Sequence, residues 1–503
     1  MKPIQSISIT RMALGFAVLV LSATGSLRAQ FAEDVLRFST FNLGVGARSA
    51  GMGNVSIGLA DDYSALFTNP AGLASLRSYE FSVGLSNSGY NNDATFFGNT
   101  VNANSRVTNL NNLGLVYPVP TSRGSLVFAF GYARVADYSA AASFNGFNPS
   151  SSIVSSLIPN ATVNGMSASD RKSFLDDNIL YQTYLADLDT VTGRLVPNVT
   201  DSVQQRGSVT EEGGMNNWSL GGSVEIAKGL FLGVGINLLS GSYFYDRVYT
   251  ESDARSVYLK NLKRIDFDRF EYESTFNSDL SGYNGLVGLM YRKQGKFKIG
   301  VAVRTPTYYD ISESFSDAGN SRFYLLVDGV KDYDHRTSGS TKYNVRTPFV
   351  LSGGASFQAT DWLLLAGDAE YTDWTQMEFT NTDNQDLLDE NRVILDLFRP
   401  TTNLRGGAEI TFFSLGLKLR GGVVFNPSPY LVDQNTHDYD QLHFTGGFGF
   451  AVDENVLLNA SLAFGKWKTF RDNYYLPGLA AAPSRTNESV NTNSMNVTLS
   501  YRF

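Results

Sequence analysis

Six charged residues between positions 368 and 420 are spaced as if they shared one face of neighbouring strands: Asp368, Glu370, Arg405, Glu409, Lys418 and Arg420. Alternate residues of a strand point to the same side, so all six would face the interior of a closed sheet. Opposite charges on adjacent strands can pair, and an arginine can receive a ligand carboxylate. The pattern predicts a structural ladder, extended by Arg48 or Asp61, or a ligand carboxylate held by Arg405 or Arg420.

The sequence offers few residues for catalysis, metal binding or phosphate binding. There is no cysteine, which excludes a disulfide framework, a thiolate metal site and a cysteine nucleophile. His335, His437 and His443 have no G-x-S-x-G motif nearby, and Gly233-Val-Gly235 falls within a strand pattern, so it is not a phosphate loop. A formal net charge of -8 argues against nucleic acid as a partner. We therefore expect no enzyme, no cofactor and no metal site.

The elements that would position the charged residues are strands of alternating polarity. In Met495–Phe503, apolar residues at 495, 497, 499, 501 and 503 alternate with polar ones. The same pattern predicts fourteen strands, near 78–86, 111–118, 124–132, 216–226, 230–243, 283–292, 296–304, 345–357, 362–373, 403–412, 416–426, 441–452, 455–465 and 494–503.

The connections between these strands alternate between short and long. Short turns are predicted at 227–229, 293–295, 413–415 and 453–454, and long loops at 87–110, 133–215, 244–282, 305–344, 374–402, 427–440 and 466–493. Outer-membrane barrels have short periplasmic turns and long extracellular loops. The fold class is therefore all-β: a 14-stranded antiparallel transmembrane β-barrel over residues 78–503. An even strand count places both barrel ends, including Phe503, on the periplasmic side. A soluble propeller or sandwich does not explain the loop alternation.

The first 29 residues predict export to the outer membrane. Lys2 and Arg11 precede the apolar run 12–21, and small residues lead to a cleavage site at Ala29-Gln30, so residues 1–29 are interpreted as a signal peptide. Ten apolar residues are too few for an anchor helix.

Two helices are predicted within the long loops. Ser167–Leu188 begins with a capping box at Ser167 and Asp170, and 386–398 precedes Pro400. They would form a lid or cradle for an apolar ligand, or ordinary loop packing.

Residues 30–77 form a separate N-terminal unit. Six glycines between Gly44 and Gly72 argue against a regular strand or a long helix. Asp61 or Asp62 would cap a short helix over 63–67, and Asn69-Pro70 would end it.

This stretch resembles the N-terminal hatch of the FadL/TodX family, outer-membrane transporters of long-chain fatty acids and aromatic hydrocarbons. The resemblance lies in R-S-A-G-M-G (48–53), A-D-D (60–62) and L-F-T-N-P-A-G-L (66–73), with further agreement over 131–151 and 370–379. It implies a hatch that plugs the lumen from the periplasmic side and contains the motif residues Arg48, Gly51, Asp61, Asp62, Asn69, Pro70 and Ala71. It also implies that a hydrophobic ligand enters among the extracellular loops, occupies the lumen and leaves through a gap in the wall after a hatch shift.

Four residues with apolar side chains fall on inward positions: Val127, Leu364, Val424 and Leu457. These residues would line a site for a hydrophobic ligand or pack against the hatch. The predicted function is passive, hatch-gated uptake of fatty acids or similar lipophilic molecules, with small hydrophobic molecules and outer-membrane lipid as partners. The alternative is a PorV-like component of a protein-secretion system that binds a protein partner through its extracellular loops. The third hypothesis is that the protein is a structural or porin-like barrel.

Overall fold

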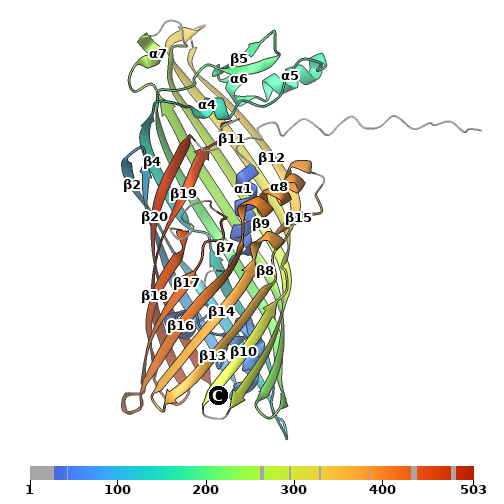
Figure 1. The fold of residues 1–503 in the computed structure, drawn as a ribbon, viewed down its shortest axis with the longest axis vertical. Helices are drawn as coiled ribbons and strands as arrows, with labels where there is room; N and C mark the ends of the chain where they lie inside the picture. The colour runs from blue at the N-terminus through green and yellow to red at the C-terminus, as the bar shows by residue number, and fades with distance from the viewer. Residues whose placement is uncertain are drawn as a thin grey trace, which may run out of the picture.

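The computed structural model describes residues 28–41, 44–260, 265–293, 296–327, 330–382, 384–431, 439–476 and 483–503. Nearly all of the predicted signal peptide, and parts of the predicted connections 293–295, 427–440 and 466–493, lie outside the described residues. The strands form one closed antiparallel barrel of fourteen traverses, which confirms the predicted fold class (Figure 1). β1 pairs with β20 from Glu80↔Arg502 onward and so closes the barrel.

Ten traverses are single strands, and four consist of two collinear pieces. The single strands are β1 (Glu80–Phe96), β2 (Asn99–Val119), β7 (Val203–Ala227), β8 (Leu230–Ser252), β9 (Phe267–Lys293), β16 (Pro400–Phe412), β17 (Leu417–Asn426), β18 (Gln441–Ala451), β19 (Val456–Tyr474) and β20 (Ser484–Arg502). The two-piece traverses are β3 (Leu126–Asp137) with β4 (Ala140–Asn148), β10 (Phe297–Arg304) with β11 (Tyr308–Val327), β12 (Val330–Arg346) with β13 (Val350–Thr360), and β14 (Leu363–Asp373) with β15 (Glu378–Thr380).

Several predicted long loops are wrong, because the strands continue beyond the apolar band. β1 and β2 are joined by Phe97 and Gly98 alone, both with positive φ, where a loop over 87–110 was expected. Most of 244–282, 305–344 and 466–493 is also strand. The upper half of β2 carries mainly Asn, Ser and Thr, so it lacks the apolar stripe on which the prediction depended. The wall is consequently uneven: β9 has 27 residues and β17 only 10.

The connection after β4 forms a headpiece above the barrel (Figure 1). It contains α4 (Ile153–Ser156), α5 (Ala168–Asp176), α6 (Ile179–Gln182) and the hairpin of β5 (Ala186–Asp189) and β6 (Arg194–Pro197). The Ser167 hydroxyl accepts a hydrogen bond from Asp170 N, which confirms the predicted cap, but the helix does not extend to Leu188. The second predicted helix is confirmed as α8 (Gln385–Leu397). Short helices α7 (Val257–Lys260), η2 (Trp374–Gln376) and η3 (Phe413–Leu415) complete the connections.

The N-terminal residues lie inside the barrel (Figure 1). α1 (Arg28–Ser39) lies beside α8, far from the end at which β20 finishes, and α2 (Ala47–Gly51), α3 (Ala65–Thr68) and η1 (Pro70–Ser75) lie lower in the lumen. The predicted helix over 63–67 begins at Ala65 instead, because Asp62 closes the preceding turn by accepting from Ser64 N at 2.9 Å. Among the described helices, none is both long enough and apolar enough to cross a membrane.

The outer face of the barrel carries exposed apolar side chains. Leu220, Val234 and Ile236 are 54–63% exposed and alternate with inward residues along β7 and β8. An apolar outer band of this kind is typical of a barrel surrounded by lipid.

Candidate functional site

The N-terminal segment (residues 44–76) is seated against inward-facing glycines of the barrel wall. A methyl group added at Gly233 would overlap the backbone of Pro70 and Ala71, and one added at Gly422 would overlap that of Met52 and Gly53. The other wall glycines that leave room for this segment are Gly114, Gly131, Gly221, Gly288, Gly300, Gly354, Gly407 and Gly447. At Gly233, Gly300, Gly407 and Gly422 the backbone of the segment therefore packs directly on that of the wall, and at Gly114 and Gly131 the Tyr63 ring does so.

The motif Asn69-Pro70-Ala71 lies against β7, β8 and β9. The Asn69 side-chain amide donates to Ile57 O at 2.9 Å, and its oxygen accepts from Ala71 N at 3.2 Å. Ser223 donates from its hydroxyl to Ala71 O at 2.9 Å. Asn69 and Ala71 are fully buried, so these hydrogen bonds fix the turn to the wall without competition from solvent.

Charged groups attach the opposite side of the N-terminal segment. Glu409 accepts from Arg48 Nε at 3.1 Å, Lys418 Nζ at 3.0 Å and Arg420 Nε at 2.7 Å. Asp61 pairs with Arg48 and with Lys298 Nζ, the latter at 3.0 Å. Burial by itself would raise the pKa of Asp61, but the two cations outweigh it and hold that pKa below its usual range.

The predicted ladder therefore exists, and it includes Arg48 and Asp61. Among the described residues, one of its members, Asp368, does not pair with a cation of a neighbouring strand, whereas Arg405 does pair with an anion. Asp368 accepts backbone N–H groups of the N-terminal segment, from Ser56 at 2.5 Å and Ile57 at 2.8 Å. Arg405 pairs with Glu370 at 3.1 Å. Asp62 lies 3.8 Å from Arg48, and Gly51 packs on Gly447.

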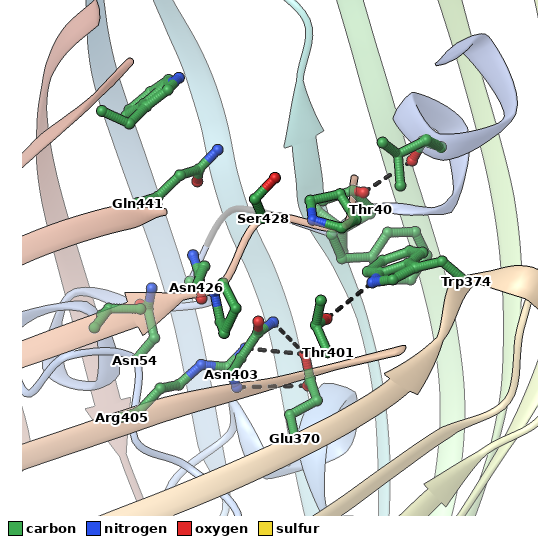
Figure 2. Close-up of a pocket in the computed structure, with 18 of the residues that line it drawn as sticks. Thr40, Asn54, Glu370, Trp374, Thr401, Asn403, Arg405, Asn426, Ser428 and Gln441 are labelled. Carbon is green, nitrogen blue, oxygen red and sulfur yellow. Dashed lines mark hydrogen bonds and ion pairs between the residues drawn. The ribbon is translucent and has the colours of Figure 1, made fainter. Parts of the chain in front are cut away.

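Two cavities adjoin the N-terminal segment. The central cavity, of about 350 Å³, is bordered by α1, the top of the N-terminal segment and β14–β19 (Figure 2). The lower cavity, of about 170 Å³, is bordered by Arg48, Asp61 and the ion cluster. Val424 and Arg405 line the central cavity, and Leu457 and Arg420 the lower one.

The two remaining lumen candidates line neither cavity. Val127 is fully buried in the hydrophobic cluster that it shares with Ala71 and Leu73, so it packs against the N-terminal segment. Leu364 is half-buried beside Glu409 in the strand register.

The central cavity is more polar than the sequence suggested. Figure 2 shows Asn54, Asn403, Asn426 and Gln441 gathered around one space, with Trp374 donating to Thr401 Oγ1 at 2.9 Å. Aromatic side chains complete the lining: Phe41, Phe67, Trp374, Tyr430, Tyr439, Trp467 and Phe470. The alternation of inward and outward residues along the strands identified the cavity residues that lie on strands. It gave no signal for the cavity residues that α1 and the loops supply. In the described part of the chain, no group of three or more metal-ligating side chains could hold a metal ion.

The barrel wall has a break beside this cavity. β2 pairs with β3 only from Val119↔Leu126 to Asn112↔Ala133, and the register of β3 on β7 shifts between Arg134 and Ala136. Above that point β4 pairs with β7, and within the described residues no ladder joins β4 to β2. The Asn109 side chain crosses the break to Asp137 at 3.1 Å. Val135, at the register shift, lines the central cavity.

Solved structures share this architecture. The toluene transporter TodX of Pseudomonas putida matches with a TM-score of 0.53 and 16% identity over 92% of this chain and 99% of TodX. A Pseudomonas aeruginosa FadL homologue matches with a TM-score of 0.55 and 12% identity, over 92% of this chain and all of the homologue (100%). This chain has the FadL/TodX barrel fold. The Ralstonia pickettii toluene transporter TbuX agrees, with a TM-score of 0.50 and 16% identity over 92% of this chain and 100% of TbuX. No protein-family model and no curated protein matches the sequence.

Proposed function

We propose that this chain is an outer-membrane channel for the passive uptake of lipophilic small molecules. One observation carries the proposal: the central cavity reaches the wall at Val135, where the ladder between β2 and β3 ends. A molecule in that cavity has a short sideways path between β2 and β4. The fold is shared with the toluene transporters TodX and TbuX, and this favours uptake over a secretion component.

The N-terminal segment would obstruct a straight path through the lumen, so the sideways path through the wall would be the shorter one. It fills the lumen below the central cavity with buried backbone and with the Glu409 ion cluster. A straight path would require breaking those contacts, whereas the sideways path crosses the packed seam between β2 and β4, which no backbone ladder closes among the described residues. We infer that residues 30–77 act as a hatch with the barrel termini on the periplasmic side, and that an apolar ligand leaves into the lipid.

A cysteine pair across the break tests the proposed route. The chain has no cysteine, so Asn109→Cys with Asp137→Cys introduces a single bridge between β2 and β3. Uptake of a radiolabelled fatty acid or toluene into cells should fall at least about tenfold on oxidation and recover on reduction. The matched control is Asn87→Cys with Thr108→Cys, which links residues already opposite each other on β1 and β2.

Uptake that is equal in the oxidised and reduced test pair would contradict the sideways route. Uptake that is equal in cells with and without the wild-type protein would contradict the channel itself.

A further inference from the structure

Helix α8 carries two exposed leucines beside its packed face. Leu387 and Ile394 are buried in the hydrophobic cluster that also contains residues of α1, so this face of the helix is turned to the lumen. Leu388 and Leu395 each follow one of these buried residues and stand about 100° further round the helix. They are 37% and 58% exposed, and both lie on one stripe because seven residues make about two helical turns.

A third exposed leucine lies at the C-terminal end of α8. Leu431 is 57% exposed, and its backbone N–H donates to Leu397 O at 2.7 Å. Leu431 is therefore at the same end of the helix as Leu395. These three side chains, the α8 leucines, are Leu388, Leu395 and Leu431.

The height of α8 on the barrel is set by β15. Phe379 N donates to Asn391 Oδ1 at 2.8 Å, and Asn391 Nδ2 donates to Phe379 O at 3.1 Å. The middle of the helix is thus tied to this strand, and Figure 1 shows α8 beside β15 at the edge of the barrel. Phe379 lies directly opposite Val345 of β12, four residues before the exposed Phe349 on the same traverse.

Exposed aromatic side chains mark the edge of the apolar outer band at this height. Arg346, the residue after Val345, lies opposite Tyr308 of β11, and Tyr308 lies opposite Tyr283 of β9. The two tyrosine rings are stacked at 5.7 Å, and both are exposed on the outer face. Aromatic residues gather where a barrel wall meets the lipid headgroups. Helix α8 therefore lies at the level of the membrane surface.

We propose that the α8 leucines insert into the outer leaflet of the membrane, with lipid acyl chains as their partner. They continue an existing lipid-facing surface, because Leu404 of the apolar outer band follows the end of α8 by seven residues. Asp389 and Asp396 each follow one of the helix leucines and stand a further 100° round, toward water. A helix that presents an apolar stripe between a packed face and a charged face can lie in the plane of the interface.

Spin labels test this assignment, because the chain has no cysteine and Leu388→Cys or Leu395→Cys carries a single nitroxide. The protein is placed in nanodiscs of phosphatidylethanolamine and phosphatidylglycerol. The measured quantity is the accessibility of the label to oxygen, which concentrates in lipid, divided by its accessibility to a water-soluble nickel chelate. Leu404→Cys gives the reference value for the apolar band, and Val191→Cys, in the headpiece hairpin and 84% exposed, gives the value for water.

Labels at Leu388 and Leu395 should give ratios at least about threefold above that at Val191. The matched control on the same helix, Asp396→Cys, should give a lower ratio than Leu395→Cys. Ratios equal to that at Val191 would show that the leucines face water and would overturn the inference. Low accessibility to both reagents would overturn it as well, because a second copy or another protein would then cover the leucines. Heat-modifiable gel mobility reports whether each labelled barrel is folded.

Discussion

Replacing Glu409 with glutamine should loosen the N-terminal segment without opening the barrel. The Glu409 carboxylate holds three cations at 2.7–3.1 Å, and its side chain is 3% exposed. The amide is nearly isosteric but neutral, so Arg48 and Arg420 would remain buried beside each other without their shared anion. The barrel keeps its complete strand ladder, because β16 pairs with β14 and β17 through backbone groups.

The magnitude follows from the burial of this cluster. Removing one partner of a buried ion pair costs about 3–5 kcal/mol. Arg48 belongs to the N-terminal segment, and the charge on Glu409 favours its docked position over any position away from the wall. Since about 1.4 kcal/mol corresponds to a factor of ten, the population with the segment undocked should rise about 100- to 4000-fold.

Limited trypsin digestion after Arg48 measures that population, because cleavage follows the fraction of open molecules when opening is rapid. The matched control is Glu378→Gln, whose partner Arg346 is 44% exposed, since exposed pairs contribute about 0–1 kcal/mol. Heat-modifiable gel mobility reports whether the barrel is intact. A cleavage rate in Glu409→Gln within twofold of wild type would refute the assignment of the ion cluster as the attachment of this segment.

Three further predictions follow from the lumen contacts. Gly422→Ala should destabilise docking of the N-terminal segment by about 1–3 kcal/mol, because the new methyl group would overlap Gly53. The control is the neighbouring Gly421→Ala, whose new methyl group would lie 3.9 Å from the nearest atom outside its strand. This control should change the melting temperature little. Burial raises the pKa of Asp34 to about 7, so the docking free energy of α1 should be greatest below about pH 4 and decline as pH rises through 7. Hydrogen exchange of 28–39, corrected for intrinsic rates, should be slower at pH 5 than at pH 8. Asp34→Asn should reduce this difference and leave the part that Glu33 contributes, because burial raises the pKa of Glu33 as well. Intact mass spectrometry of protein from the outer membrane should give a chain that begins at Gln30.

The barrel could be predicted from sequence because its membrane-facing strands alternate between two chemically different environments. Each of the fourteen predicted strands overlaps an observed traverse. Above the apolar band the outer face meets water, as in Asn99–Val119, whose first half alternates between exposed polar residues and half-buried small residues such as Val101 and Ala103. Composition there cannot separate a strand from a loop, since the ladder depends on backbone groups.

The site was less predictable, because pairing depends on distances between strands that are remote in sequence. The inward face of β10 places Lys298 and Arg304 in the lumen, but only the three-dimensional arrangement pairs Lys298 with Asp61 and places Arg304 beside the central cavity. The wall glycines carry a signal that could have been used. Gly233, Gly288 and Gly422 fall on inward positions where a large lumen would otherwise favour bulky side chains.

The two possible exits make opposite predictions for one variant. If ligands leave downward past the N-terminal segment, Glu409→Gln should raise both ion conductance in planar bilayers and uptake of a lipophilic acid, because both would pass through the same opening. If ligands leave sideways at Val135, conductance should rise while uptake stays close to wild type, since the break between β2 and β4 does not involve Glu409. Combining Glu409→Gln with the oxidised Asn109→Cys and Asp137→Cys pair separates the routes: uptake that remains blocked in the triple variant, despite high conductance, places the exit in the wall.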